Sequence, residues 1–264
     1  MTTEGLRHPR LSASGNRPAE HSMHRPRPER GLDPSYTTII HTDNRSQPLV
    51  VRQAKVLGRL HAPRIDGGAL ICENARIICD GDLRVSTIIG YGTIIVQGET
   101  TCTELDFVGD IRCAGQVRCC GTARVAGMLQ AEGGLVACTL DMIGVLSAPR
   151  LVANGSAIID TLGDGLWAHR TLPCRDSHSM IRSIEAHQVE ARRLHCDQIN
   201  AKCIVLKDAS DVRTVPLEAH LTVDEGSRIR FFERHDGHLL AAGRMIPTAI
   251  QPFHCQARAC PVRR

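Results

Sequence analysis

Aromatic side chains are nearly missing from this chain. Only 3% of its 264 residues are aromatic, although 42% are hydrophobic, and the rings amount to one Trp, two Tyr and four Phe. Aromatic rings normally supply much of the buried area of a core, and exposed rings form the platforms on which nucleic-acid bases stack. Their scarcity disfavours an aromatic nucleic-acid platform or a sugar-stacking cleft. It favours many similar layers with a core of Ile, Val, Leu, Ala and Cys.

Long apolar segments are missing as well. No run of 18 apolar residues suits a membrane span, and residues 1–19 hold no apolar stretch of the kind found in secretory signals. Twelve cysteines in a chain without an export signal indicate free thiols rather than a disulfide framework. The net charge of +4 indicates no particular partner. We expect a cytoplasmic protein, which is also compatible with the inner face of the membrane.

The first 48 residues are poor in apolar side chains. Five prolines lie between Pro9 and Pro34, and six arginines are scattered around them. Such a segment buries too little apolar surface to offset the entropy lost on ordering, so we predict a disordered, solvated tail over 1–48. Binding of the basic tail to nucleic acid or to an acidic membrane surface is the alternative, and four acidic side chains weaken it.

Glycines recur every six residues in the middle of the chain. They occupy positions 109, 115, 121, 127 and 133, within the hexads VGDIRC, AGQVRC, CGTARV and AGMLQA. Odd positions from 111 to 131 are apolar or small, and even positions are mostly polar. This alternation is the period of an extended strand, but it continues for too many residues to be a single strand of ordinary length. The pattern predicts short strands joined by tight corners, which is an all-β fold of the parallel β-helix, or β-solenoid, type.

The same alternation continues upstream, with predicted inward positions at Ile77, Cys79, Gly81, Leu83 and Val85. Three hexads per coil stack residues 18 apart at the strand spacing of roughly 4.8 Å. Ile111 then lies against Leu129, and Arg112 lies against Gln130. We expect the interior to be narrow enough to admit aliphatic and small residues but not large rings, which accounts for the scarcity of aromatics.

A second repeat has a period of five. Its main apolar positions are Ile184, Val189, Leu194, Ile199 and Ile204, and each is followed two residues later by another apolar residue, at Ala186, Ala191, Cys196, Ala201 and Leu206. On a helix the main positions spread around the whole circumference, so they form no apolar stripe. We predict pairs of inward residues separated by two-residue corners. An amphipathic helix, favoured by the Glu, Ala and Arg content, is the alternative.

These patterns divide the chain into five parts. After the tail we predict a solenoid of hexads over 49–161, an interrupting loop over 162–180 and a solenoid of pentads over 181–232. A basic C-terminal tail follows over 233–264.

The repeats resemble those of the bactofilins, a family of polymer-forming bacterial cytoskeletal proteins. The similarity rests on GDLRV (81–85), FVGDIRCAGQVRC, RVAGML and the I-x-A-x-x-V-x-A pattern from Ile184, and it covers about residues 50–232. It implies a right-handed parallel β-helix that joins end to end into filaments without nucleotide or other cofactor. It further implies that the main partner is the chain itself, with the tails available to proteins of the cell envelope or membrane, and that no nucleotide or specific nucleic acid is bound.

Exposed ends support self-association independently of that resemblance. The terminal coils of a solenoid present unpaired strand edges and an apolar cross-section unless a cap covers them. We find no capping helix pattern at 48–60, and Phe231 and Phe232 place two adjacent rings at the other end. These two rings are our candidate polymerisation interface, and a simple cap over the last coil is the alternative reading.

Enzymatic readings find little support in the sequence. A hexapeptide acyltransferase needs a catalytic or metal-binding His, but no His occurs from 62 to 168, and the residues before the glycines are irregular. A small-ligand site in the interrupting loop, with Trp167, His169, Cys174 and His178, is the alternative function. The groups His195-Cys196 with Cys203 and His254-Cys255 with Cys260 lack zinc-ligand spacing, and we expect them to be structural. We therefore expect no catalytic, cofactor or metal residues, and we expect exposure of Cys120 but not of Cys119.

Overall fold

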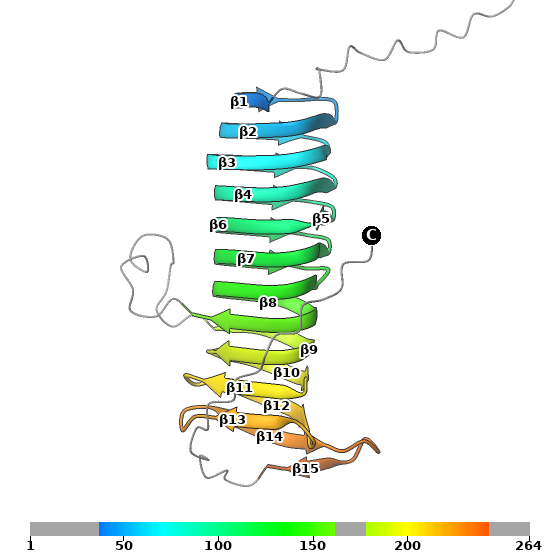
Figure 1. The fold of residues 1–264 in the computed structure, drawn as a ribbon, viewed down its shortest axis with the longest axis vertical. Helices are drawn as coiled ribbons and strands as arrows, with labels where there is room; N and C mark the ends of the chain where they lie inside the picture. The colour runs from blue at the N-terminus through cyan, green and yellow to red at the C-terminus, as the bar shows by residue number, and fades with distance from the viewer. Residues whose placement is uncertain (1–36, 162–177, 243–264) are drawn as a thin grey trace, which may run out of the picture. The chain divides into compact units, whose positions relative to one another are not determined.

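The computed structural model describes residues 37–161 and 178–242, which form a β-solenoid of about 11 turns (Figure 1). Each strand from β1 to β14 pairs in parallel with strands of the neighbouring coils, and only β15 pairs antiparallel, with β14. No helix occurs in these two ranges. The prediction of an all-β parallel β-helix is confirmed.

The strands follow one another with short connections, and the longest pass around a corner of the coil without a break. Their bounds are β1 (Thr37–Asn44), β2 (Leu49–Ala62), β3 (Ile65–Cys79), β4 (Leu83–Val96), β5 (Thr100–Cys102), β6 (Glu104–Cys113), β7 (Val117–Ala131), β8 (Leu135–Asp160), β9 (Ser179–Arg192), β10 (Leu194–Asn200), β11 (Cys203–Lys207), β12 (Asp211–Pro216), β13 (His220–Val223), β14 (Arg228–Glu233) and β15 (Leu239–Ala241).

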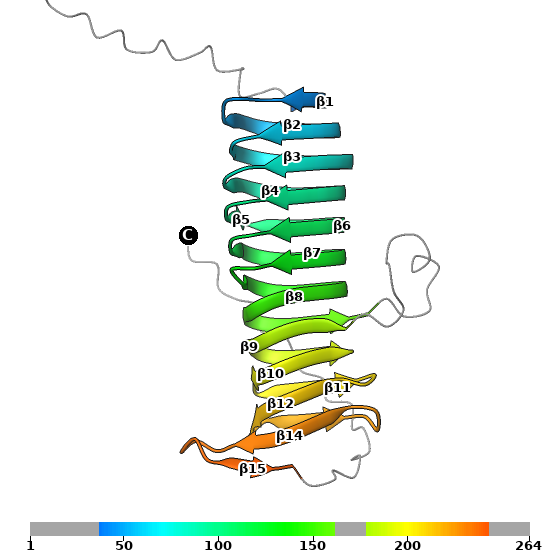
Figure 2. The ribbon, with the colours of Figure 1, turned by 180° about the vertical axis from the view of Figure 1, so that it is seen from behind.

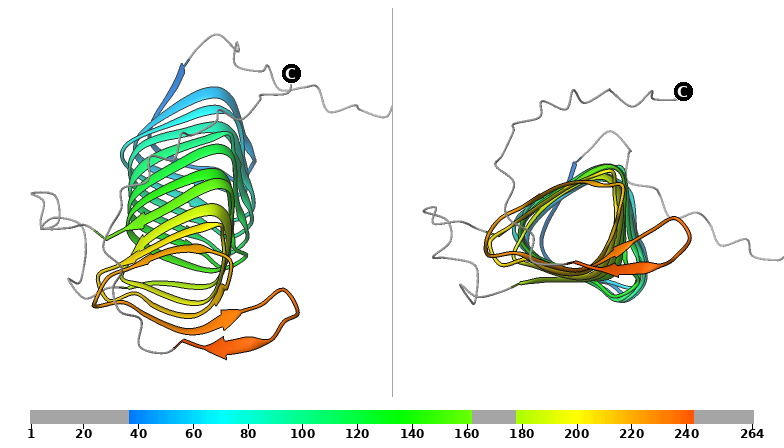
Figure 3. Two further views of the ribbon diagram at one scale, coloured as in Figure 1. Left: turned by 60° about the horizontal axis from the view of Figure 1, so that its bottom comes forward. Right: turned by 90° about the horizontal axis from the view of Figure 1, so that it is seen from below.

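The coils lie directly over one another, as the views from the front and from behind both show (Figures 1 and 2). Seen along its axis the solenoid has a rounded, three-sided outline (Figure 3). The space inside this outline is filled by one continuous core of aliphatic and small side chains, together with several cysteines. The core therefore runs the length of the solenoid, and each coil contributes only a few residues to it.

The register in the hexad region agrees with the predicted stacking. Ile111 lies opposite Leu129, and Arg112 lies opposite Gln130, as three hexads per coil require. The period is not uniform, because Ile94 lies opposite Ile111, an offset of 17 residues. Irregularities in the strand pairing, such as the one between Cys119 and Thr122, absorb the difference. The hexads thus describe single coils correctly but not the whole stack.

The pentad region also forms coils of strands, so the helical alternative is wrong. Ile184 lies opposite Ile199 and Val189 lies opposite Ile204, both at an offset of 15 residues, which is three pentads. All five main positions of the repeat are buried. Their partners two residues later are buried too, except Ala186, which is partly buried against the same core.

One expectation about the interior is wrong. Phe107 is a large ring at an inward position of the hexad region, yet only 1% of it is exposed. The ring fits because Gly90 occupies the stacked position in the coil before it, where no side chain competes for space, and Val125 follows in the next coil. An aromatic ring is thus accommodated where a neighbouring coil supplies a glycine.

The solenoid extends beyond the predicted limits at its N-terminal end. β1 lies inside the segment 1–48, which we expected to be a tail, and it pairs in parallel with β2. Ile40 supplies the reason, because its side chain is inward and buried in the core although the surrounding composition is polar. Residues 1–36 lie outside the described ranges.

The interruption between the two repeats is narrower than predicted, and the stack continues across it. β9 begins at Ser179, inside the expected loop of 162–180, and β8 pairs directly with β9 from Ser147 opposite Met180 onward. The two repeats therefore form one solenoid rather than two. At the other end, β15 lies inside the expected tail of 233–264.

One corner of the hexad region is built from a file of glycines. Gly92, Gly109, Gly127 and Gly144 lie opposite one another in successive coils, and their φ angles range from +128° to +141°. A Cβ atom on Gly127 would lie 2.2 Å from the carbonyl oxygen of Gly109. Both the backbone conformation and the close approach of the coils exclude a side chain here. We call these four residues the glycine corner.

Candidate functional site at the ends of the solenoid

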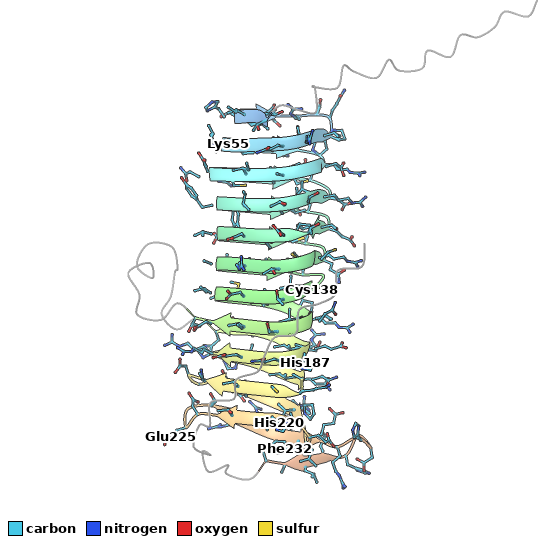
Figure 4. All side chains as sticks on the ribbon, in the orientation of Figure 1. Lys55, Cys138, His187, His220, Glu225 and Phe232 are labelled. Atoms are coloured by element: carbon cyan, nitrogen blue, oxygen red, sulfur yellow. The ribbon has the colours of Figure 1, made fainter. Side chains whose placement is uncertain are left out.

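The two predicted rings lie on β14, near the C-terminal end. Phe232 lies opposite Val215 of the preceding coil and packs against the core, and it is labelled near the end of the stack in Figure 4. Phe231 lies opposite Thr214 and is partly buried. On its other edge β14 is covered by β15, so neither ring belongs to the terminal strand. Phe232 acts as part of a cover over the last coil.

The terminal strand carries two leucines that the sequence reasoning missed. Leu239 and Leu240 on β15 are 50% and 44% exposed. β15 returns along β14 through a turn in which the Gly237 N–H donates to the carbonyl of Arg234 at 2.9 Å, with φ of +79° at Gly237. The adjacent leucines after a glycine were the available signal, but we had assigned them to a tail.

The last coil leaves part of the core accessible. Ile204 and Leu206 on β11 are fully buried, whereas Leu221 and Val223, which lie opposite them on β13, are only partly buried. Among the described strands β13 pairs with β11 alone, so its other edge is open. The C-terminal end thus combines an open strand edge with apolar side chains that are incompletely covered.

Polar contacts hold the last coil to the one before it. Arg230 on β14 donates to Asp211 on β12 at 2.6 Å, and this hydrogen bond lowers the pKa of Asp211 while it raises that of Arg230. Gln198 donates to Glu233 at 3.0 Å across two coils. These contacts fix β14, and through it β15, at a defined place on the stack.

The N-terminal end differs from the C-terminal end. The inward residues of the first coils, Ile40 and Leu49, are buried. Two other large apolar side chains, Ile39 and Val50, are exposed there at outward positions. Among the described strands β1 pairs with β2 alone, so this end also offers a strand edge.

The alternative site in the interrupting loop is only partly visible. Trp167, His169 and Cys174 lie outside the described residues. His178 is described, and its ring lies 4.5 Å from that of His195, at an interplanar angle of 39°. His195 also lines an open surface hollow of about 670 Å³. Nothing in the described ranges brings the other predicted loop residues to this place.

The cysteines behave as the alternation predicts. Cys120 is exposed and Cys119 is buried, so the two neighbours point to opposite faces. A hydrogen bond with the Cys102 thiol lowers the pKa of Cys119 to about 7, whereas burial raises the pKa of Cys72 to about 12.

The first predicted structural group also falls where the repeat places it. Cys196 is inward and buried, burial raises its pKa to about 12, and Cys203 lies on another strand. In the described ranges no three His, Cys, Asp or Glu side chains gather as a metal site would require. His254, Cys255 and Cys260 lie outside those ranges.

The residues that precede the hexad glycines face outward. Val108, Ala114 and Cys120 are exposed and Ala126 is half-buried, so none of them supplies a core position. The coil interior is instead built from the alternate positions, as the strand period predicted.

No family model, no curated protein and no solved structure matches this chain. Within the described ranges no helical segment has the length and apolar character that a membrane crossing requires.

Proposed function

We propose that this protein is a self-assembling scaffold whose solenoids join end to end into filaments without nucleotide, as in the bactofilins that its repeats resemble. The observation that carries the proposal is the C-terminal end, where β13 has an open edge and Leu239 and Leu240 on β15 are exposed. Open edges and apolar side chains at the end of a solenoid favour association with another copy.

The arrangement of the ends supports a closed, two-fold contact at each of them. The last coil and β15 differ from the first coil in sequence and in burial, so the two ends are not complementary by construction. A self-complementary patch on each end gives isologous contacts, tail to tail and head to head. Alternation of the two contacts builds a filament from one kind of subunit.

The structure indicates which residues to change in a test. Phe232 packs on the core, so its replacement by a charge would damage the last coil as well as any contact. Leu239→Asp together with Leu240→Asp changes side chains that are already exposed. We expect wild-type protein to form filaments in negative-stain microscopy without nucleotide, and we expect the double variant to stop at monomers or head-to-head dimers.

A matched control places the same charge elsewhere. Val136 is a half-buried outward residue in the middle of the stack, and Val136→Asp should leave filaments unchanged. Wild-type protein that stays a monodisperse monomer at tens of micromolar would refute the proposal. Filaments of the double variant that match those of wild type would show that β15 is not the contact.

A further inference from the structure

A stripe of apolar side chains runs along one side of the hexad region. Tyr91, Val108, Ala126 and Ile143 occupy the same outward position in four successive coils, beside the glycine corner. Tyr91, Val108 and Ile143 are 50%, 47% and 39% exposed, and Ala126 is half-buried. We call these four residues the apolar stripe. An exposed patch that repeats from coil to coil is typical of an interaction surface.

A file of charges lies next to the stripe, at the outward position two residues earlier in each coil. From Ile89 it continues in register through Asp106, Arg124 and Asp141. Lys55, labelled in Figure 4, stands in the same file nearer the N-terminal end. Within the described ranges, Asp106, Arg124 and Asp141 form no ion pair within 4.0 Å. Their order along the file is negative, positive, negative.

This order makes the surface complementary to a second copy in one orientation. A two-fold axis that is perpendicular to the solenoid and passes between the coils of Val108 and Ala126 reverses the order of the coils. It places Asp106 of each copy opposite Arg124 of the other, so that two symmetric ion pairs form. It also places Val108 opposite Ala126 and Tyr91 opposite Ile143, so that all four members of the stripe are covered.

Other arrangements of two copies fit less well. A two-fold axis parallel to the solenoid brings Asp106 opposite Asp110, the outward residue on the other side of the stripe, and places two negative charges together. Moving the perpendicular axis by one coil leaves Tyr91 uncovered. Like charges placed opposite each other weaken an interface and select against the wrong register.

We propose that two copies of this chain associate side by side and antiparallel through the apolar stripe, with reciprocal Asp106–Arg124 ion pairs. The contact uses a side of the solenoid, whereas the proposed filament uses its ends, so each can exist without the other. In a filament it joins two strands of subunits laterally. In a protein that does not polymerise it forms a dimer.

Charge reversal tests the pairing directly. Asp106→Arg brings two arginines opposite each other in the antiparallel pair, and Arg124→Asp brings two acids together, so each variant alone should associate at least about tenfold more weakly than wild type. A mixture of the two variants restores opposite charges at both positions. We expect the mixture to regain wild-type association, measured by sedimentation velocity and by the width of filaments in negative stain.

The mixing experiment separates the contact from effects within one chain. Asp106 and Arg124 are neighbours in adjacent coils, and a loss of stability there cannot be restored by adding another variant. Val108→Glu should abolish lateral association, whereas Val136→Glu, on the coil of Ile143 but away from the stripe, should not. Single variants that associate like wild type, or a mixture that does not recover, would overturn the proposal. Wild-type protein without lateral pairs at tens of micromolar would overturn it as well.

Failure of this proposal and failure of the filament proposal have different signatures. Loss of lateral association leaves filaments of normal length that are one subunit wide. Loss of end-to-end association leaves short side-by-side dimers, which charge reversal still dissociates.

Discussion

The hexad and pentad regions turn their corners in different ways. The glycine corner of the hexad region has φ angles of +128° to +141°, a conformation that other residues rarely adopt. The pentad region turns through Arg193, Asp208 and Ala209, whose φ angles lie between +49° and +61°. These are left-handed helical values, which residues with a side chain reach at a cost of about 1–2 kcal/mol. One solenoid thus contains corners that require glycine and corners that only favour it.

The largest effect should come from a side chain at the glycine corner. In Gly127→Ala the new Cβ would lie 2.2 Å from the carbonyl oxygen of Gly109, so the two coils must separate or the corner must change its conformation. We expect the free energy of unfolding to fall by more than about 3 kcal/mol, or folding to fail. Denaturant unfolding followed by circular dichroism measures the change, and a loss below about 1 kcal/mol would show that the corner can relax.

A smaller effect should follow from a corner carboxylate in the hexad region. Asp82 accepts a hydrogen bond from the backbone N–H of Glu99 at 3.0 Å, and this bond, with the nearby Arg84 and Arg64, lowers the pKa of Asp82. We expect Asp82→Ala to cost about 1 kcal/mol at neutral pH.

The pH dependence of this effect has a defined sign. Because the native pKa lies below the ordinary value of 3.8, the contribution is complete above that value and is lost as the pH falls through the native pKa. The difference in unfolding free energy between wild type and Asp82→Ala should therefore be constant from pH 5 to 7 and shrink below pH 3.8. A difference that grows in acid would contradict the assignment.

The smallest effect should come from the pentad region. Ala209 has a φ of +61°, so Ala209→Gly removes the cost of the left-handed conformation but increases the freedom of the unfolded chain. We expect a change within about 1 kcal/mol, and we expect it to be stabilising. The same denaturant measurement compares it with Gly127→Ala, and equal losses in both variants would remove the distinction between the two kinds of corner.

The sequence predicted the fold because both repeats place apolar residues with a strict local period. Alternation at Ile77, Cys79 and Leu83 and the pentads from Ile184 each identify inward positions without knowledge of the neighbouring coil. The room inside the coil is different, because it depends on which residues stack together. Phe107 fits only because Gly90 lies opposite it, and this pairing follows from an offset of 17 that the hexads do not show.

The ends were harder to predict than the middle. β1 and β15 are short segments without a repeat, and their strand conformation depends on pairing with β2 and β14. Local composition therefore assigned both to tails, and Leu239 and Leu240 went unnoticed as surface residues. The candidate rings were placed at the correct end, but whether a ring such as Phe232 faces the core or a partner depends on the strand that follows.

The pairing of β8 with β9 has a consequence for how this protein tolerates changes in length. Ser147 lies opposite Met180, although neighbouring coils are normally offset by about half as many residues. Register is therefore set by the contacts between adjacent strands and not by the number of residues that connect them. A reporter domain inserted between Thr161 and His178 should leave the stack of coils intact, so this corner is a suitable position at which to label the protein in a living cell.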